Sequence, residues 1–493
     1  MDQKTSIPPD KGPSIAIVGG GFGGIACAVK LKQAGFEDVT VFEQSSGPGG
    51  TWWDNTYPGC EVDIPSHAYS FSFFQDFDWT RTHARRSELQ AYADATIDRF
   101  GLRPKFRFGT KVESATWDEA RRLYRVRLAD GETRDFNIVV SALGMLNVPK
   151  YPDWPGLEDF EGIRFHTARW EHQHDLTGQR LAFVGTGSTA SQAVPELATK
   201  AGHLYLFQRS PAWVMAKADR DYTPEERARF RRQPWRVRWE RLLWFIGYGN
   251  VLKALMAGSK TNKQMEAVCL AHLHSVVQDP ELRRALTPDY PWGCKRPVFA
   301  STFYESLTRP NVTLVPKAVQ RVTRTGVVDA DGIEREVDVL VMSTGFQPQR
   351  YVANLQVVGR DGASLEQVWN QEPAAFLGIT VPRFPNFFML YGPNTNGGSI
   401  IMQLESQAGV VVRAARRMRR QGLKVIDTRP SSYAAYVRWV DRQNHTAQSA
   451  SFAGCGNYFF SPGGRNVTQW PGSQLRYRLM TRLLPRFAAI AEA

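Results

Sequence analysis

The sequence has few cysteines, and their spacing serves neither redox nor metal chemistry. Five cysteines occur in 493 residues, at positions 27, 60, 269, 294 and 455. No two of them form a CxxC or CxxxxC pair, and none has a metal-ligand spacing with the nine histidines. The pattern argues against a dithiol redox centre, predicts no metal site and favours a reducing, cytoplasmic location.

Long hydrophobic runs and segregated charge are also missing. No stretch of roughly 18 uncharged apolar residues occurs, so we expect no membrane-spanning helix. The polar first residues, MDQKTSIPPDKGPS, lack the apolar run of a signal peptide. The net charge of +13 is spread along the chain, whereas a nucleic-acid-binding protein usually concentrates its charge on one face or tail. We therefore expect no nucleic-acid partner.

A first dinucleotide-binding motif lies close to the N-terminus. The apolar run 15–18 (IAIV) predicts a strand, GGGFGG follows at 19–24, and a helix is expected over 25–34. Gly19 permits the tight turn, Gly21 lets the backbone approach a pyrophosphate, and Gly24 lets helix and strand pack closely. A second strand, 39–42, ends at Glu43, which is placed to bind a ribose. The Gly-Gly pair at 49–50 favours FAD over NAD, because it allows close approach of a bulkier ligand.

A second dinucleotide-binding motif begins near residue 180. The run RLAFV at 180–184 predicts a strand, and GTGSTA follows at 185–190, a GxGxxA variant of the same motif. The next expected strand, 204–207, leads to Gln208-Arg209-Ser210. Where an NAD site would carry an acid, Arg209 can accommodate a 2′-phosphate, so the motif favours NADPH.

Several further segments resemble one known family. Between the two motifs, FEGIRFHTARW at 160–170 has the form FxGxxxHxxxW, with Phe160, Gly162, His166 and Trp170 at the defining positions. GGTWWDNTYPGCEVD at 49–63, GCKRP at 293–297 and WPG at 470–472 add to the resemblance. Together they resemble the type I Baeyer–Villiger monooxygenases, which are class B flavoprotein monooxygenases that depend on FAD and NADPH.

The resemblance implies a reaction and the residues that perform it. The expected reaction is NADPH- and O2-dependent insertion of oxygen next to a ketone carbonyl, by way of a C4a-peroxyflavin, giving an ester or lactone. Arg296 is the expected catalytic residue, since a guanidinium is permanently charged and presents several donors to a peroxide anion and the oxyanion that follows. Asp63 is expected to hold Arg296, and Lys295 to reach the NADPH 2′-phosphate beside Arg209.

Taken together, motifs and resemblance predict one set of cofactor-contacting residues. The set is Gly19, Gly21, Gly24, Glu43, Gly50, Trp52, Asp63, Tyr69, Val112, Gly185, Thr186, Gly187, Ser188, Gln192, Arg209, Ser210, Lys295 and Trp470. His166 is expected to couple the two domains. The expected partners are a ketone and O2, with no stable membrane insertion, at most weak peripheral contact, and a monomeric or small homo-oligomeric state.

The region 223–273 has the amphipathicity of helices. Thr223-Pro224-Glu225-Glu226 is a typical helix start. An apolar stretch at 242–256 follows an Arg/Trp-rich run, which is consistent with a helix on a membrane surface or a helical cap over the substrate site. The resemblance favours the cap.

The expected fold class is α/β, with two Rossmann-like dinucleotide-binding domains and a helical insert in the NADP domain. The FAD domain is predicted at 1–152 and 348–493, the NADP domain at 153–213 and 293–347, and the insert at 214–292. Three alternative functions fit less well. N- or S-oxygenation of amines or sulfides is disfavoured by Arg296 and Trp170, and a disulfide reductase by the missing cysteine pair. No feature points to a non-catalytic sensor.

Overall fold

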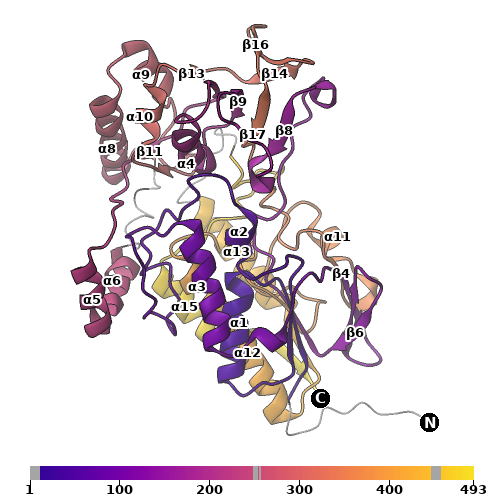
Figure 1. Cartoon of the computed structure of the whole chain (residues 1–493). Coiled ribbons are helices and arrows are strands. Elements are labelled where there is room, and N and C mark those ends of the chain that lie inside the picture. The colour runs from indigo at the N-terminus through magenta and orange to yellow at the C-terminus, as the bar shows by residue number, and fades with distance from the viewer. Residues whose placement is uncertain (1–11, 248–253, 255–256, 446–456) are drawn as a thin grey trace.

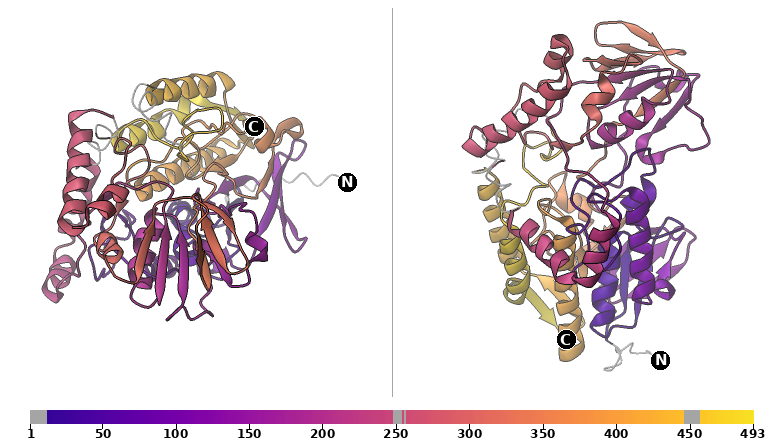
Figure 2. Two further views of the ribbon diagram at one scale, coloured as in Figure 1. Left: turned by 90° about the horizontal axis from the view of Figure 1, so that it is seen from above. Right: turned by 60° about the vertical axis from the view of Figure 1, so that its left-hand side comes forward.

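Two parallel sheets organise the computed structural model, which describes residues 12–247, 254, 257–445 and 457–493. Each sheet has five strands. They lie in the lower and upper halves of the molecule in Figure 1, and the two views of Figure 2 show helices packed around both. The fold class is therefore α/β, as the sequence predicts. Residues 1–11 and Cys455, which the sequence interpretation used, lie outside the described residues.

The first sheet carries the first glycine-rich motif. Its strand order is β19-β7-β1-β2-β3, with β1 and β7 at the centre. The run IAIV is buried on both faces, as a central parallel strand requires. The strands are β19 (Phe387–Met389), β7 (Ile138–Ser141), β1 (Ile15–Val18), β2 (Val39–Phe42) and β3 (Phe106–Arg107).

The second sheet repeats this plan around the second motif. Its order is β13-β10-β9-β17-β8, and every neighbouring pair is parallel. The strand before the motif, β9, pairs with the strand after it, β10, as β1 pairs with β2 in the first sheet. The strands are β13 (Val312–Val315), β10 (His203–Phe207), β9 (Arg180–Val184), β17 (Val339–Met342) and β8 (Ile163–His166).

Smaller sheets flank these two. A four-stranded sheet packs beside the first, with strands β18 (Gln356–Val358), β4 (Val112–Asp118), β5 (Leu123–Leu128) and β6 (Thr133–Phe136). A three-stranded sheet lies beside the second, with strands β14 (Val319–Val322), β15 (Gly326–Asp329) and β16 (Glu334–Glu336). There are also two short pairs, namely β11 (Val214–Met215) with β12 (Val298–Phe299), and β20 (Val425–Thr428) with β21 (Ala489–Glu492).

Helices cover the sheets and join the two halves. α1 packs on the long helix α12 from the C-terminal part of the chain, so both ends of the sequence build the lower half (Figure 1). One continuous buried cluster includes residues of both large sheets, among them Val140 and Phe183. The helices here are α1 (Phe22–Gln33), α2 (Thr51–Asp54), α3 (Arg86–Arg99), α4 (Ser188–Leu197), α10 (Phe303–Leu307), α11 (Leu365–Trp369), α12 (Ile400–Gln421), α13 (Pro430–Asn444), α15 (Gln474–Leu483) and α16 (Pro485–Ala488).

The helical insert forms as predicted, but its position differs from the expected cap. Its helices are α5 (Pro224–Arg232), α6 (Pro234–Gly247), α8 (Lys260–Val276) and α9 (Pro280–Leu286), and α5 begins with a capping box between Thr223 and Glu226. Among the described residues of the insert, only Tyr290 lines the cavity between the sheets. The cap interpretation of 242–256 therefore fails for the described part of that stretch, because α6 packs on the lower half and turns apolar side chains to solvent.

The cysteines give a mixed result. Cys27, Cys60 and Cys269 are free and buried, and burial raises the pKa of Cys269 to about 11. Cys294, however, is disulfide-bonded. The cysteine pattern therefore supports a reducing location less than the sequence alone indicated.

Candidate active site

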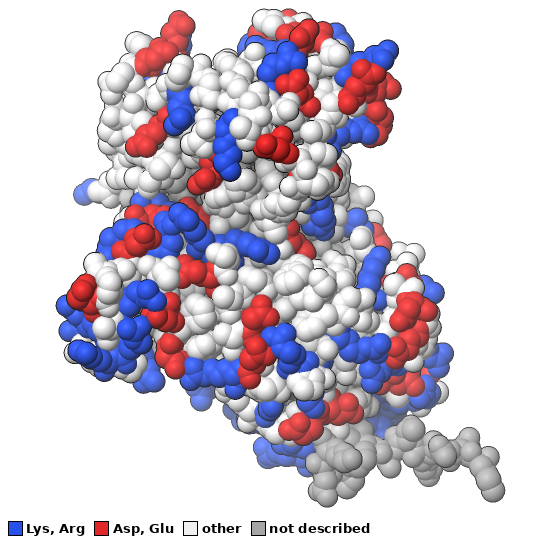
Figure 3. Space-filling model, viewed as in Figure 1, with Lys and Arg blue, Asp and Glu red and all other residues white. Residues whose placement is uncertain are grey.

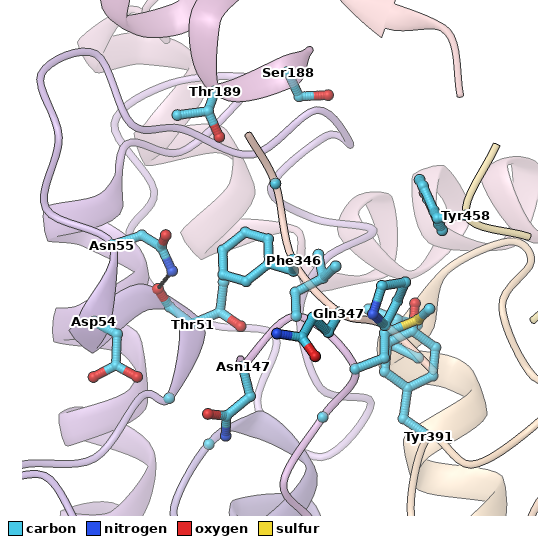
Figure 4. A pocket seen from close by; sticks show the side chains of 18 of the residues that line it. Thr51, Asp54, Asn55, Asn147, Ser188, Thr189, Phe346, Gln347, Tyr391 and Tyr458 are labelled. Carbon is cyan, nitrogen blue, oxygen red and sulfur yellow. Dashed lines mark hydrogen bonds between the residues drawn. The ribbon is translucent and has the colours of Figure 1, made fainter. Parts of the chain in front are cut away.

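One large cavity lies between the two parallel sheets. Its volume is about 1240 Å³, above the roughly 300–1,000 Å³ of an ordinary small-molecule pocket. Both glycine-rich loops open into it. Figure 4 shows Thr51 and Asn147 on one side, Ser188 and Thr189 on another, and Phe346 and Gln347 between them. The cavity thus meets the carboxyl ends of strands from both sheets, where nucleotides bind in folds of this kind.

The first glycine-rich loop is packed too tightly for side chains. A methyl group on Gly24 would overlap the carbonyl oxygen of Gly19, so helix and strand approach closely only with glycine there. Gly19 itself has a φ of +109°. A Cβ on Gly50 would come within 2.9 Å of the Gly21 Cα, since the two glycine-rich segments lie against each other. Gly19, Gly21 and Gly50 line the cavity, whereas Gly24 acts through packing.

Glu43 lies where the sequence places it, at the end of β2 and in the cavity wall. Its carboxylate accepts hydrogen bonds from the backbone N–H groups of Gly20, at 2.6 Å, and Ser45, at 2.8 Å. Burial raises the pKa of Glu43, and these two N–H groups offset part of the rise. An ionised carboxylate has about four acceptor positions, so Glu43 keeps capacity for a ribose hydroxyl. The residue fits the adenosine end of FAD.

The second glycine-rich loop leaves room in front of the helix that follows it. Gly185 has a φ of +119°, and a Cβ on it would collide with the Ser343 carbonyl oxygen. At Gly187 a Cβ would meet no atom within 4 Å, so that side of the loop is open. α4 begins at Ser188, and its N-terminal N–H groups face the opening. Thr186, Gly187 and Ser188 line the cavity, and the arrangement fits a pyrophosphate.

Two cations meet at the far end of this second loop. The Lys295 ammonium donates to the Ser210 hydroxyl at 2.6 Å. Burial, and then the neighbouring Arg209 charge, lowers the pKa of Lys295. Arg209 makes no ion pair with any described residue. Two positive groups and a hydroxyl without a paired carboxylate form a site suited to a phosphate, as expected for the 2′-phosphate of NADPH.

Asp63 and Arg296 form the ion pair that the predicted chemistry requires. The guanidinium Nη2 of Arg296 donates to Asp63 Oδ2 at 2.6 Å. Burial acts to raise the pKa of Asp63, but the charge and hydrogen bond of Arg296, a backbone hydrogen bond and the Lys217 charge together outweigh it, and the pKa is lowered. Arg296 remains 43% exposed although it lies deep between the sheets, because its outer face borders the cavity. The Arg296 guanidinium, with Asp63 as its counter-ion, therefore presents a fixed positive charge to whatever occupies that space.

The aromatic residues expected beside the flavin border the same space. Trp52 Nε1 donates to the Tyr69 hydroxyl at 3.2 Å, and the two rings meet edge to face. Both line the cavity, as does Val112 at the start of β4. Burial raises the pKa of Tyr69 beyond the range of ordinary titration. The Tyr69 hydroxyl is therefore a neutral hydrogen-bonding group.

Gln192 connects α4 to the segment that carries Asp63. Its Oε1 accepts from the Tyr57 hydroxyl at 2.9 Å and from Glu61 N–H at 3.2 Å, and its Nε2 donates to the Glu61 carbonyl. The buried Lys217 ammonium pairs with the Glu61 carboxylate. These contacts join the second half of the protein to a residue two positions before Asp63.

The 160–170 motif lies at the junction of the halves, and Thr167 is its one residue that lines the cavity. Gly162 has no room for a methyl group, which would collide with the Asp338 carbonyl, and Phe160 is buried. Trp170 packs edge to face on Phe165. His166 accepts from Ala168 N–H at 3.0 Å through Nδ1, and burial lowers the pKa of His166 to about 4. A neutral, packed histidine fits coupling rather than catalysis.

Gly24, Gly185 and Trp470 are the predicted contact residues that do not line the cavity, and of these only Trp470 has a side chain. It is 1% exposed, packs on Trp439 and Tyr477, and does not line the cavity. Its backbone N–H donates to the Asn396 carbonyl at 2.8 Å. Trp470 thus supports a cavity-lining loop from behind, and its contact with the cofactor stays a prediction.

Sequence reasoning missed several cavity residues. Tyr391 and Tyr458 border the cavity on the side opposite Thr51 (Figure 4). Burial raises the pKa of Tyr458, although the nearby Arg296 charge acts to lower it. Asn147 follows β7 of the first sheet, and Gln347 follows β17 of the second. None of these residues carries a sequence pattern that marks it, because they converge only through the tertiary fold.

Fold and site together define a two-nucleotide α/β oxidoreductase. Residues 17–83 match a family model described as an NAD(P)-binding Rossmann-like domain. A Baeyer–Villiger monooxygenase of Pseudomonas aeruginosa is 39% identical over 472 residues, covering 95% of this chain and 89% of the relative. One of Streptomyces coelicolor is 40% identical over 473 residues, covering 95% and 90%. The chain belongs to the Baeyer–Villiger monooxygenase family.

Solved structures agree along nearly the whole chain. Cyclohexanone monooxygenase from Rhodococcus sp. Phi1, bound to NADP+, superposes with a TM-score of 0.87 at 29% identity, covering 98% of this chain and 99% of that one. An oxidised steroid monooxygenase bound to NADP gives a TM-score of 0.87 at 28% identity, covering 97% and 99%. The fold is therefore that of flavin monooxygenases with two nucleotide sites.

Proposed function

We propose that this enzyme uses NADPH and O2 to insert oxygen next to a ketone carbonyl, giving an ester or lactone, with Arg296 and Asp63 as its catalytic pair. The observation that carries the assignment is the 2.6 Å ion pair at the wall of a cavity shared by two nucleotide loops. N- or S-oxygenation of amines or sulfides is not favoured, since the full-length relatives are named for the ketone reaction.

The chain's own residues supply positioning and charge. When bound, FAD supplies the redox chemistry that takes a hydride from NADPH and activates dioxygen. Arg296 offers a permanent charge and several N–H donors to negative oxygen atoms in the cavity, including the one that develops from the ketone oxygen. Asp63 accepts a hydrogen bond from that guanidinium and so orients it. Because the Asp63 pKa is lowered, the pair stays charged at neutral pH.

Cofactor binding divides between the two halves. We assign the first loop, Glu43, Trp52, Tyr69 and Val112 to FAD. We assign the second loop with Gln192, Arg209, Ser210 and Lys295 to NADPH. The division of the chain into an FAD domain (1–152 and 348–493), an NADP domain (153–213 and 293–347) and an insert (214–292) belongs to the same proposal.

A product analysis tests the reaction. Purified protein, NADPH and air are incubated with a panel of linear, cyclic, aromatic and steroid ketones, and products are identified by mass spectrometry. We expect at least one ketone to gain a single oxygen atom as an ester or lactone, with label from ¹⁸O2. Oxidation of amines or sulfides with no ester from any ketone would instead support the heteroatom reaction.

Location and assembly are separate matters. None of the described helices is long and apolar enough to cross a membrane. The cytoplasmic location and the monomeric or small homo-oligomeric state stay predictions.

A further inference from the structure

Helix α6 is amphipathic, but its apolar side faces solvent. Large apolar side chains recur along it at spacings of three, four and seven residues, which places them on one side. Their exposed fractions range from 44% to 61%. They are Trp235, Trp239, Leu242, Leu243 and Ile246. Single exposed apolar residues are ordinary, but a continuous apolar stripe usually marks a binding surface.

The opposite side of α6 anchors the helix to the protein. Val237 and Arg241 are buried, one helical turn apart. The Arg241 guanidinium donates to the Ser70 carbonyl and lies 3.4 Å from the Glu405 carboxylate. Glu240 pairs with His67 at 2.6 Å. The helix is thus held by Val237, Glu240 and Arg241, so exposure of the apolar stripe is built into the fold.

A second helix has the same construction. On α15, Leu475, Leu479 and Leu483 follow each other at intervals of four, with exposed fractions of 53%, 49% and 47%. Phe487 of α16 continues the row at the same interval and is 73% exposed. The other side of α15 is anchored by Tyr477, which is 1% exposed and donates to the Leu377 carbonyl.

The two apolar rows lie on neighbouring helices. Both helices lie against α12, since Arg241 of α6 is 3.4 Å from Glu405 of α12 and α15 packs on α12. In Figure 1, α5, α6 and α15 occupy the same side of the lower half. We call the exposed residues of α6, α15 and α16 named above the apolar face.

Positive charge surrounds the apolar face. No acidic residue occurs between 474 and 488, and the only one on α6, Glu240, is paired with His67. Figure 3 shows Lys and Arg side chains gathered over α5 and α6. Eight arginines of this region make no ion pair with any described residue, namely Arg229, Arg232, Arg236, Arg238, Arg476, Arg478, Arg482 and Arg486.

We propose that the apolar face docks on an anionic lipid surface, with its apolar side chains in the boundary between headgroups and acyl chains and its arginines on lipid phosphates. Interfacial helices combine these two features, and each basic residue near an anionic membrane adds to the attraction. A second copy of the chain is a poorer occupant, since a symmetric contact would bring the arginines against themselves. Docking is peripheral, because no described helix can span a membrane.

Vesicle co-sedimentation tests this proposal with the FAD-loaded enzyme. We expect binding to vesicles of phosphatidylcholine and phosphatidylglycerol in equal parts, and much weaker binding to phosphatidylcholine alone. The double variant Leu242→Asp/Leu479→Asp should lower the partition coefficient at least tenfold. Arg478→Gln/Arg482→Gln should lower it by about fivefold per arginine, and added salt should weaken binding in the wild type.

Matched control variants distinguish docking through the apolar face from nonspecific adsorption to vesicles. Ile333 is 54% exposed on the turn between β15 and β16, away from the apolar face, so Ile333→Asp should bind vesicles like the wild type. Lys200, an exposed residue shortly after α4, is not part of the apolar face, so Lys200→Gln, which removes one positive charge there, should also bind vesicles like the wild type. FAD content and ketone turnover without vesicles should be unchanged in every variant, which shows that each is folded.

Three results would overturn the proposal. The first is the absence of wild-type binding to anionic vesicles. The second is binding that the two double variants do not weaken. The third is a vesicle-free dimer that Leu242→Asp/Leu479→Asp dissociates, which would assign the apolar face to a second copy of the chain.

Discussion

The two glycine-rich loops share a motif but differ at its third small residue. In the first loop a methyl group on Gly24 would overlap the Gly19 carbonyl, whereas in the second Ala190 is accommodated and fully buried. The residue at this position is therefore decided by the distance between helix and strand, and it carries no information about the ligand.

The ends of the following strands differ in a way that does concern the ligand. Glu43 turns its carboxylate toward the first loop and receives two backbone N–H groups. Its counterpart Gln208 turns away and donates to the Ala285 carbonyl of the insert at 2.8 Å. Arg209 then borders the cavity in its place. One site thus offers an acceptor for hydroxyl groups, and the other a cation for a phosphate.

The largest expected effect is the loss of ester formation when Arg296, which lies between the two loops, is replaced. Arg296→Ala leaves both nucleotide sites intact, so FAD and NADPH should still bind. Ester formation should fall on the order of 100-fold or more, because a fixed donor to negative oxygen is lost. Electrons from NADPH should appear as hydrogen peroxide, measured against ester by product analysis.

Two further variants test whether the loss is specific to the guanidinium of Arg296. Arg296→Lys should rescue little, since an ammonium lacks the planar fork, and Arg324→Ala removes an exposed arginine as a control. Near wild-type ester yield in Arg296→Ala would show that the Lys295–Arg296 pair serves only to bind phosphate.

The next effect tests the packing difference between the loops. Gly24→Ala should destabilise the protein by about 3 kcal/mol, the upper part of the usual range for overpacking, because backbone must move. Ala190→Gly, the reciprocal change, should cost only about 0.5–1 kcal/mol. Thermal unfolding and bound FAD measured by absorbance compare the two. Equal losses of stability in Gly24→Ala and Ala190→Gly would mean that helix and strand pack equally closely in the two loops.

The strand-end difference predicts a change in cofactor preference. Arg209→Ala should reduce the preference for NADPH over NADH by about tenfold to a hundredfold, mainly through the NADPH KM, since a charge-assisted hydrogen bond is worth about 1.5–3 kcal/mol. Glu43→Gln is the matched variant and should weaken FAD binding while leaving that preference unchanged. An unaltered preference in Arg209→Ala would remove this residue from the phosphate site.

The smallest effect concerns the junction between the two halves. His166 has a folded pKa of about 4, below its unfolded value of 6.5, so the unfolded chain binds the proton more readily. Stability from the neutral ring is complete above pH 6.5 and is lost as the pH falls toward 4. Between pH 7 and 5 the wild type should lose on the order of 1 kcal/mol more than His166→Gln. Denaturant titrations of both proteins at pH 7 and pH 5 give the free energies of unfolding. An equal loss of unfolding free energy in the wild type and His166→Gln would contradict the prediction.

Much of this comparison could be predicted from local sequence. The runs at 15–18, 39–42 and 180–184 form strands with the predicted limits, because apolar runs beside glycine-rich turns have few other stable arrangements. α1 begins at Phe22, three residues before the predicted start. Gly23 and Gly24 belong to the helix despite their low helix propensity, since packing outweighs it.

Other features depend on contacts between distant parts of the chain. The approach of Asp63 to Arg296 was inferred from family resemblance, and no local pattern requires it. Tyr458 could not be found because nothing in its neighbourhood distinguishes it from a core tyrosine. The outward direction of α6 could not be predicted either, since an amphipathic pattern does not say which side meets the protein.

The Asp63–Arg296 pair has a consequence for how this activity can be inherited. Each nucleotide site is encoded in a short continuous stretch, 19–43 or 185–210, and such a stretch can pass between genes as a module. The catalytic pair joins residues 233 positions apart. Recombination that transfers either stretch alone carries nucleotide binding with it, and oxygen insertion passes on only when both ends of the pair travel together.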